Sequence, residues 1–150
     1  MKNKALIGTL IALVILVAGS MIYDQTKNES AKNGDIKIGI LQYVTHDALD
    51  EIERGIEDGL ADAGYDKANA KITVLNAEGD QSKIQTMSKQ LVHAKNDVVI
   101  GIATPAAQGL ASATKDIPVV MGAISDPVGA KLVKNLKKPE GNVTGVSNQV

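Results

Sequence analysis

The chain has 150 residues, enough for one ordinary domain, and its 16 Lys and Arg against 17 Asp and Glu give a formal net charge of -1. This even balance, without a long basic run, argues against nucleic acid as a partner, because such binding needs clustered basic residues. With no cysteine and only two histidines, His46 and His93, the sequence predicts neither a metal site nor a cofactor.

The first 34 residues are predicted to be a signal or membrane anchor and a tether. Lys2 and Lys4 precede an uncharged apolar run over residues 5–23, long enough to cross a hydrocarbon core at about 1.5 Å per residue. Basic residues before such a run keep the N-terminus cytoplasmic, so the rest of the chain should be extracytoplasmic, and the mediocre cleavage site favours an uncleaved transmembrane anchor over a signal peptide. Residues 24–34 are polar, which is typical of a flexible tether, and this leaves residues 35–150 for the fold.

Strand and helix patterns then alternate along the chain. Residues 36–41 are a short apolar, β-branched run that predicts a strand, and residues 47–63 repeat apolar side chains at helical spacing. A second strand is expected at 71–76. In the helix after it, Ser82 and Gln85 have the spacing of a capping box.

Two further strand–helix pairs follow. They are a strand at 98–102 with a helix at 105–115, and a strand at 117–121 with a shorter helix at 127–135. Continuously apolar strands interleaved with helices imply a parallel sheet covered on both faces, so the four units predict one doubly wound, Rossmann-like α/β lobe. Residues 141–150 contain neither a terminal helix nor an obvious closure.

Two loops at the carboxyl edge of this sheet, where ligands of open parallel sheets bind, share a design. Thr104 and Asp126 each precede a proline, Pro105 and Pro127, and each is predicted to cap a helix. Two helix N-termini facing one edge suit a carboxylate or a phosphate. Neither loop has the lysine of a P-loop, and residues 42–46 lack a GxGxxG motif, so a small carboxylate is favoured over a nucleotide.

Plain structural roles compete with these binding roles. Thr104 and Asp126 can act as helix caps only, and Tyr43, the only aromatic residue at this edge, can cover the sheet end instead of stacking on a flat ligand. Ser125 beside Asp126 resembles half of a hydrolytic site, but the only histidine in these loops is His46, so a catalytic triad is disfavoured.

Three blocks of sequence, in this order, resemble a known family: IGILQYVTHDALDEIERGIEDGLADAGY, IATPAAQGLASATKDIPVVMGAISDPVGAKLV and GNVTGVSNQ. Together they look like the solute-binding component of ABC importers, in the branch that binds tryptophan or other aromatic amino acids, over residues 36–150. That resemblance implies a periplasmic-binding-protein fold of type I, in which two α/β lobes joined by hinge strands close on the ligand. We expect the chain to be the N-terminal lobe only, from a truncated reading frame or as a fragment.

The resemblance implies roles for individual residues. Thr104, with the N–H groups of Ala106 and Ala107, would receive the α-carboxylate of the ligand. Ser125 and Asp126 would face its ammonium group or further polar atoms.

Gln42 and Tyr43 would line the pocket for the ligand's side chain. Because the chain has no Trp or Phe, only Tyr43 can stack on an indole ring from this lobe. A single lobe leaves half of the ligand in water, so we expect weak binding.

The sequence therefore predicts a non-enzymatic, extracytoplasmic protein that hands a small carboxylated solute, tryptophan or another amino acid, to an ABC permease and its ATPase. Two alternatives stay open. One is a membrane-tethered sensor lobe that signals to a partner, which a neighbouring histidine-kinase gene would favour. The other, less favoured, is a secreted α/β hydrolase whose turnover would vanish in Ser125→Ala.

Overall fold

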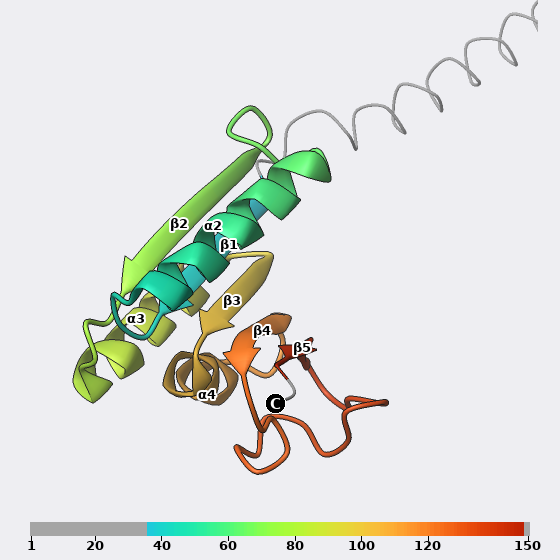
Figure 1. The fold of residues 1–150 in the computed structure, drawn as a ribbon. Coiled ribbons are helices and arrows are strands. Elements are labelled where there is room, and N and C mark those ends of the chain that lie inside the picture. Colours follow the sequence, from blue (N-terminus) through green and yellow to red (C-terminus); the bar gives the residue numbers. More distant parts are fainter. Residues whose placement is uncertain (1–35, 149–150) are drawn as a thin grey trace, which may run out of the picture. The chain divides into compact units, whose positions relative to one another are not determined.

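The structure, a computed structural model, describes residues 36–148, which form a five-stranded sheet in the order β2-β1-β3-β4-β5 with every neighbouring pair parallel (Figure 1). The sheet confirms the predicted α/β class. The elements are β1 (Ile36–Gln42), α2 (Asp47–Asp62), β2 (Ala70–Asn76), α3 (Gln81–His93), β3 (Val98–Ile102), α4 (Thr104–Ala113), β4 (Val119–Ile124) and β5 (Val143–Ser147).

Helices lie on both faces of the sheet, because the chain steps first to one side of β1 and then to the other. The step from β1 to β2 places α2 on one face, and the steps to β3 and β4 place α3 and α4 on the opposite face. The lobe is therefore doubly wound, with its switch point between β1 and β3. The core on the α2 face is formed by Ile38, Ile40, Ile100 and Ile102, and that on the other face includes Leu41, Ile84, Leu91, Val99, Leu110 and Val119.

The fourth predicted strand begins later than its apolar run suggests. Thr114 Oγ1 accepts hydrogen bonds from the N–H groups of Asp116 (3.2 Å) and Ile117 (3.1 Å), which holds these residues in a turn. Pro118 follows and has no N–H to donate. The strand therefore runs from Val119 to Ile124.

The cap predicted for the second helix is wrong. Asp80, not Ser82, is the N-cap of α3, and its Oδ1 accepts hydrogen bonds from the N–H groups of Ser82 (2.7 Å) and Lys83 (3.1 Å). The N-cap of α2 is His46, whose Nδ1 accepts a hydrogen bond from the Ala48 N–H at 3.2 Å.

The helix predicted at 127–135 is also wrong. The chain makes one turn, closed by the N–H of Leu132 donating to the carbonyl of Pro127 at 2.9 Å, and within this turn Lys131 has a left-handed φ of 58°. This backbone conformation ends the turn. Further along the chain, Val143–Ser147, for which no strand was predicted, form β5. This strand pairs with β4, and Val143 lies opposite Val119.

The predicted membrane segment and tether, residues 1–34, lie outside the described residues. Among residues 36–148, none of the helices combines the length and the apolar character that crossing a membrane requires. The division of the chain into residues 1–34 and 35–150 stays a prediction.

Candidate functional site

The candidate site is the carboxyl edge of β1, β3 and β4, next to the switch point. Hydrogen bonds tie the three strand ends together: the Tyr43 N–H donates to the Ile102 carbonyl at 3.2 Å, and the Ala103 N–H donates to the Gly122 carbonyl at 3.0 Å. The residues that were predicted to form a site follow directly from these strands. The topology therefore brings them to one edge, while their roles stay predictions.

Gln42, the last residue of β1, has a side chain that is only 1% exposed. Its Nε2 donates hydrogen bonds to the carbonyl of Val44 at 2.9 Å and to Asp50 Oδ1 at 2.6 Å, while its buried Oε1 has no partner among the described atoms. Gln42 thereby fixes the loop between β1 and α2 to the first turns of α2.

Tyr43 is half-buried and packs against the core on the α3 and α4 face. Its carbonyl accepts a hydrogen bond from the Gly79 N–H at 2.8 Å, which joins the ends of β1 and β2. This packing fits the role of covering the sheet end. Stacking on a ligand stays a prediction.

The start of α4 differs from the prediction. Ala103, not Thr104, is the N-cap, and no side chain caps the helix. The Ala107 N–H donates to the Ala103 carbonyl at 3.1 Å and is used within the helix. The N–H groups of Thr104 and Ala106 precede this first helical hydrogen bond, so neither is used within α4. Thr104 is partly exposed and Ala106 is fully buried, and their role toward an anion stays a prediction.

Small residues bring α4 against β3. Ala106 and Ala107 are fully buried, and a Cβ added to Gly101 would lie 2.6 Å from the Cα of Ala107. The start of the helix is therefore held firmly over the end of the strand.

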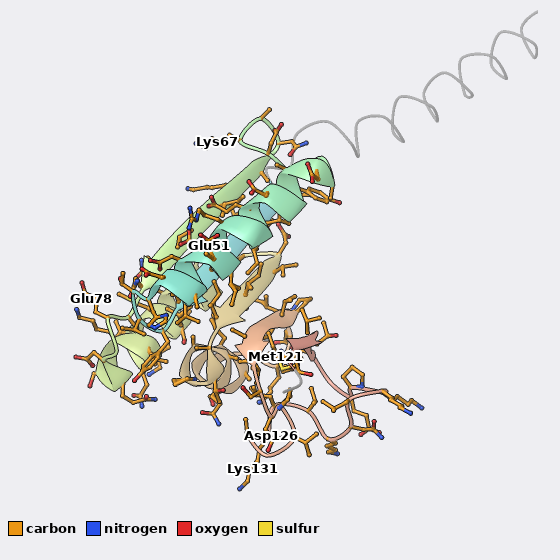
Figure 2. All side chains as sticks on the ribbon, viewed as in Figure 1. Glu51, Lys67, Glu78, Met121, Asp126 and Lys131 are labelled. Carbon is orange, nitrogen blue, oxygen red and sulfur yellow. The ribbon has the colours of Figure 1, made fainter. Side chains whose placement is uncertain are left out.

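Ser125 and Asp126 are exposed after β4, at the start of a loop that carries Lys131 further on (Figure 2). Asp126 Oδ1 accepts a hydrogen bond from the Gly129 N–H at 2.8 Å, so it caps a turn and not a helix. The second helix N-terminus expected here is absent from residues 36–148. No hydrogen bond between Ser125 and His46 occurs in the described part, and the same residues contain no group of three metal-ligating side chains.

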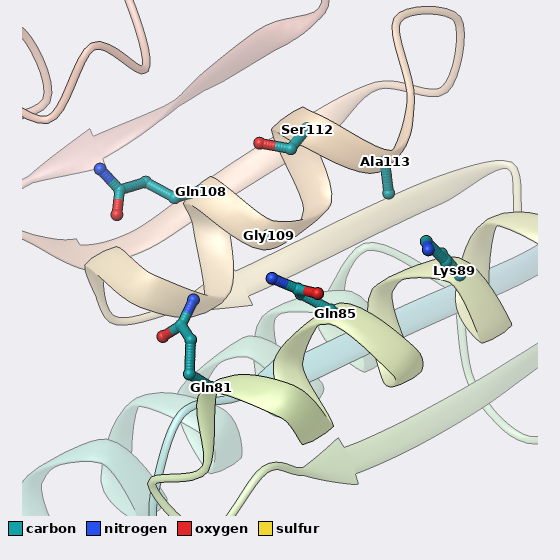
Figure 3. A pocket seen from close by; sticks show the side chains of 7 residues that line it. All are labelled: Gln81, Gln85, Lys89, Gln108, Gly109, Ser112 and Ala113. Atoms are coloured by element: carbon teal, nitrogen blue, oxygen red, sulfur yellow. The ribbon is translucent and has the colours of Figure 1, made fainter.

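Two hollows lie away from these residues. One, of about 260 Å³, separates α3 from α4 and is lined by polar side chains such as Gln85, Lys89 and Gln108 (Figure 3). The other, of about 540 Å³, is an apolar groove between α2 and the strands β4 and β5. Neither is lined by a predicted site residue.

Sequence reasoning missed Ala103. Its φ of 75° and ψ of 155° lie in a region that is essentially restricted to glycine. Nothing in the residue type signals this conformation, because alanine ordinarily avoids it.

Comparisons with known proteins agree with the fold. The model of the family described as "ABC transporter substrate binding protein" matches residues 37–150. The chain therefore belongs to this family of substrate-binding proteins, as the three sequence blocks predicted. Within it, the chain is 40% identical over 156 residues to a tyrosine-binding protein of Clostridioides difficile, an alignment that covers 98% of this chain and 45% of that protein.

Solved structures support the same assignment. A Streptococcus pneumoniae ABC domain in complex with L-Trp is 66% identical with a TM-score of 0.76, and the match covers 77% of this chain and 39% of that one. A ligand-free, open substrate-binding protein with adhesive properties from Clostridium difficile is 43% identical with a TM-score of 0.74, over 76% of this chain and 39% of that one. The chain thus spans less than half the length of the relatives it matches.

Proposed function

We propose that the chain supplies one wall of a cleft that binds an aromatic amino acid for import by an ABC transporter. The observation that carries this proposal is the start of α4 at the switch-point edge, where the N–H groups of Thr104 and Ala106 precede the first helical hydrogen bond. A helix N-terminus of this kind suits a carboxylate. The L-Trp and tyrosine-binding relatives indicate which carboxylate.

The rest of the edge suits the other groups of such a ligand. Asp126 supplies a carboxylate for the ligand's ammonium group, with Ser125 beside it. Tyr43 offers an aromatic ring to the ligand's side chain, and Gln42 holds the loop on which that ring is mounted. Ala107 contributes by packing, which leaves the donors at the edge to Thr104 and Ala106. The proposal involves no bond making, so it assigns the protein a binding role and not an enzymatic one.

The location of the protein in the cell is part of the same proposal. The segment over residues 5–23 places the lobe outside the cytoplasm, as an anchored or secreted protein, where it passes the solute to a membrane permease driven by an ATPase. A second lobe, comparable with the parts of the relatives that this chain does not span, completes the cleft.

A thermal-shift screen of the full chain against the twenty amino acids tests the proposal. A ligand that binds only the folded state raises Tm, so L-Trp or L-Tyr at millimolar concentration should raise it more than L-Ala or L-Lys. No shift with any aromatic amino acid would contradict the proposal. A nanomolar Kd for this chain alone would contradict the expectation that one wall binds weakly.

A further inference from the structure

Several lysines lie close together on the segment between β4 and β5, residues 127–142, which we call the lysine loop. The sequence has no unbroken basic run, but this loop contains Lys131, Lys134, Lys137 and Lys138. All of them are exposed, and Lys131 points away from the rest of the lobe (Figure 2). The only acidic residue in the loop is Glu140, whose carboxylate lies 3.5 Å from Lys134 Nζ. The loop therefore carries an excess of positive charge on a chain whose formal net charge is -1.

The lysine loop is fixed to the lobe, so it presents its charges from a defined surface. Leu132 and Val133 are buried in the core on the α3 and α4 face. Gln108 Nε2, on α4, donates a hydrogen bond to the Ala130 carbonyl at 2.9 Å. Leu136, by contrast, is 49% exposed among the lysines. Binding to a membrane surface combines these two features, because it depends on buried apolar area and on the attraction of lysines to anionic lipids.

The end of the lysine loop lies at the amino edge of the sheet. The Asn142 carbonyl accepts a hydrogen bond from the N–H of Val119, the first residue of β4, at 2.8 Å. All five strands are parallel, so β1 starts at this same edge, at Ile36. In the order β1-β3-β4-β5 the starts of β1 and β5 are three strand spacings apart, or about 14 Å. The predicted tether over residues 24–34 therefore joins the lobe at the edge where the lysine loop ends.

Other charges next to the loop do not oppose a negatively charged partner. Asp97 and Asp116 precede β3 and β4 at the amino edge, and each has a lysine close by in the sequence, Lys95 and Lys115. These four charges cancel. The acidic helix α2 lies on the face of the sheet opposite to the core in which the lysine loop is buried. The positive charge of the lysine loop therefore dominates this part of the surface.

We propose that the lysine loop docks the lobe on anionic lipid headgroups of the membrane that holds the predicted anchor. Residues 24–34 span no more than about 40 Å when fully extended, so an anchored lobe stays near that surface. The attraction acts over a Debye length, about 8 Å at physiological ionic strength. Docking by the amino edge leaves the candidate site, at the opposite carboxyl edge, free to meet solute. Of the proposed function, this inference needs only the anchored location and not the identity of the ligand.

The test uses the full chain in vesicles of phosphatidylcholine alone or of an equal mixture with phosphatidylglycerol, each with a nitroxide-labelled headgroup lipid as quencher. The chain has no cysteine, so Asn135→Cys provides a single site for a fluorophore in the lysine loop, and Ala61→Cys provides one on α2. Phosphatidylglycerol should raise the quenching at position 135 by about twofold and leave position 61 unchanged. The increase should disappear at about 1 M salt, where the Debye length is about 3 Å.

Charge variants show whether the lysine loop itself is responsible. One variant replaces the lysines of the loop with glutamine, and its matched control replaces as many exposed lysines around β2 and α3, at the other end of the strand order: Lys67, Lys71, Lys83 and Lys89. Both variants change the net charge equally, and neither should change Tm, because all of these side chains are exposed. Only the loop variant should lose the increase in quenching at position 135.

The outcomes separate this inference from the proposed function. If the chain floats with both kinds of vesicle but the quenching is the same, lipid docking is overturned in favour of an acidic protein surface as the partner, and the proposed function stands. Equal loss of quenching in the two charge variants also overturns the docking, because net charge alone would then explain the effect. If the chain floats with neither kind of vesicle, the anchored location fails, and the docking fails with it.

Discussion

At the residue scale, the glycine at position 101 decides how closely α4 approaches β3. A Cβ there would lie 2.6 Å from the Cα and 2.7 Å from the backbone N of Ala107, and backbone atoms cannot rotate away. We expect Gly101→Ala to lower the free energy of unfolding by about 2 to 3 kcal/mol in urea denaturation. Gly55→Ala is the matched control, because its added Cβ would meet nothing within 4 Å on an exposed stretch of α2.

The control should move in the opposite direction. Alanine is favoured over glycine inside a helix, so Gly55→Ala is expected to stabilise the chain by about 0.5 to 1 kcal/mol. Equal effects of the two substitutions would contradict the close contact between α4 and β3.

The cap of α3 provides a second test on single residues. Asp80 Oδ1 accepts two backbone N–H groups, whereas the Ser82 side chain was only predicted to cap. Asp80→Ala should therefore cost about 1 kcal/mol of stability, and Ser82→Ala should cost much less. If chemical denaturation showed a larger loss of stability for Ser82→Ala than for Asp80→Ala, Ser82 and not Asp80 would be the capping residue.

At the element scale, the charge of α2 influences stability. Burial, followed by the carboxylates of Glu57 and Asp50, raises the pKa of Glu53, and Arg54 partly opposes this. The ionised form of Glu53 is thus less favourable in the folded chain than in the unfolded chain. The contribution of Glu53 to stability is most favourable when its carboxyl is protonated, and this contribution falls as the pH rises from the unfolded pKa through the raised folded pKa.

Glu53→Gln should accordingly raise Tm at pH 7, by no more than about 3 °C for a pair effect on an exposed helix, and should give no rise at pH 3. Glu51→Gln is the control, because it removes a contact with Arg54 and should raise Tm at neither pH. A rise for Glu53→Gln that persists at pH 3 would show that ionisation of Glu53 is not the cause.

The elements also show what the sequence can and cannot predict. Residues 36–41, 47–63 and 98–102 were predicted well, because apolar periodicity is a local property. β5 was missed because Val143–Ser147 is short and mostly exposed, and it is a strand only through pairing with β4. The helix at 127–135 failed because proline and apolar spacing were present, but the left-handed Lys131 stops the turn.

The candidate site was predictable to a similar degree. The edge follows from topology, so Tyr43, Thr104 and Ser125 could be placed there from the strand order alone. The hydrogen bonding was not predictable: the Ala107 N–H is used within α4, and the N-cap is Ala103. Both depend on how the strand ends join, which no local pattern encodes.

At the scale of the whole molecule, the sheet has unequal faces. α3 and α4 cover one face, whereas on the other an apolar groove of about 540 Å³ remains between α2 and the strands β4 and β5, with Val146 74% exposed. Parallel sheets are ordinarily covered on both faces. The groove therefore leaves part of this face of the described sheet uncovered.

We propose that the carboxyl edge binds an aromatic amino acid through its carboxylate. The most direct measurement is an NMR titration of the ¹⁵N-labelled full chain with L-Trp, and with L-tryptophanamide as the ligand that lacks the carboxylate. We predict that L-Trp shifts the amide signals of Thr104 and Ala106, and that the amide form does so far more weakly. Equal shifts with both compounds, or shifts confined to residues away from this edge, would contradict the account.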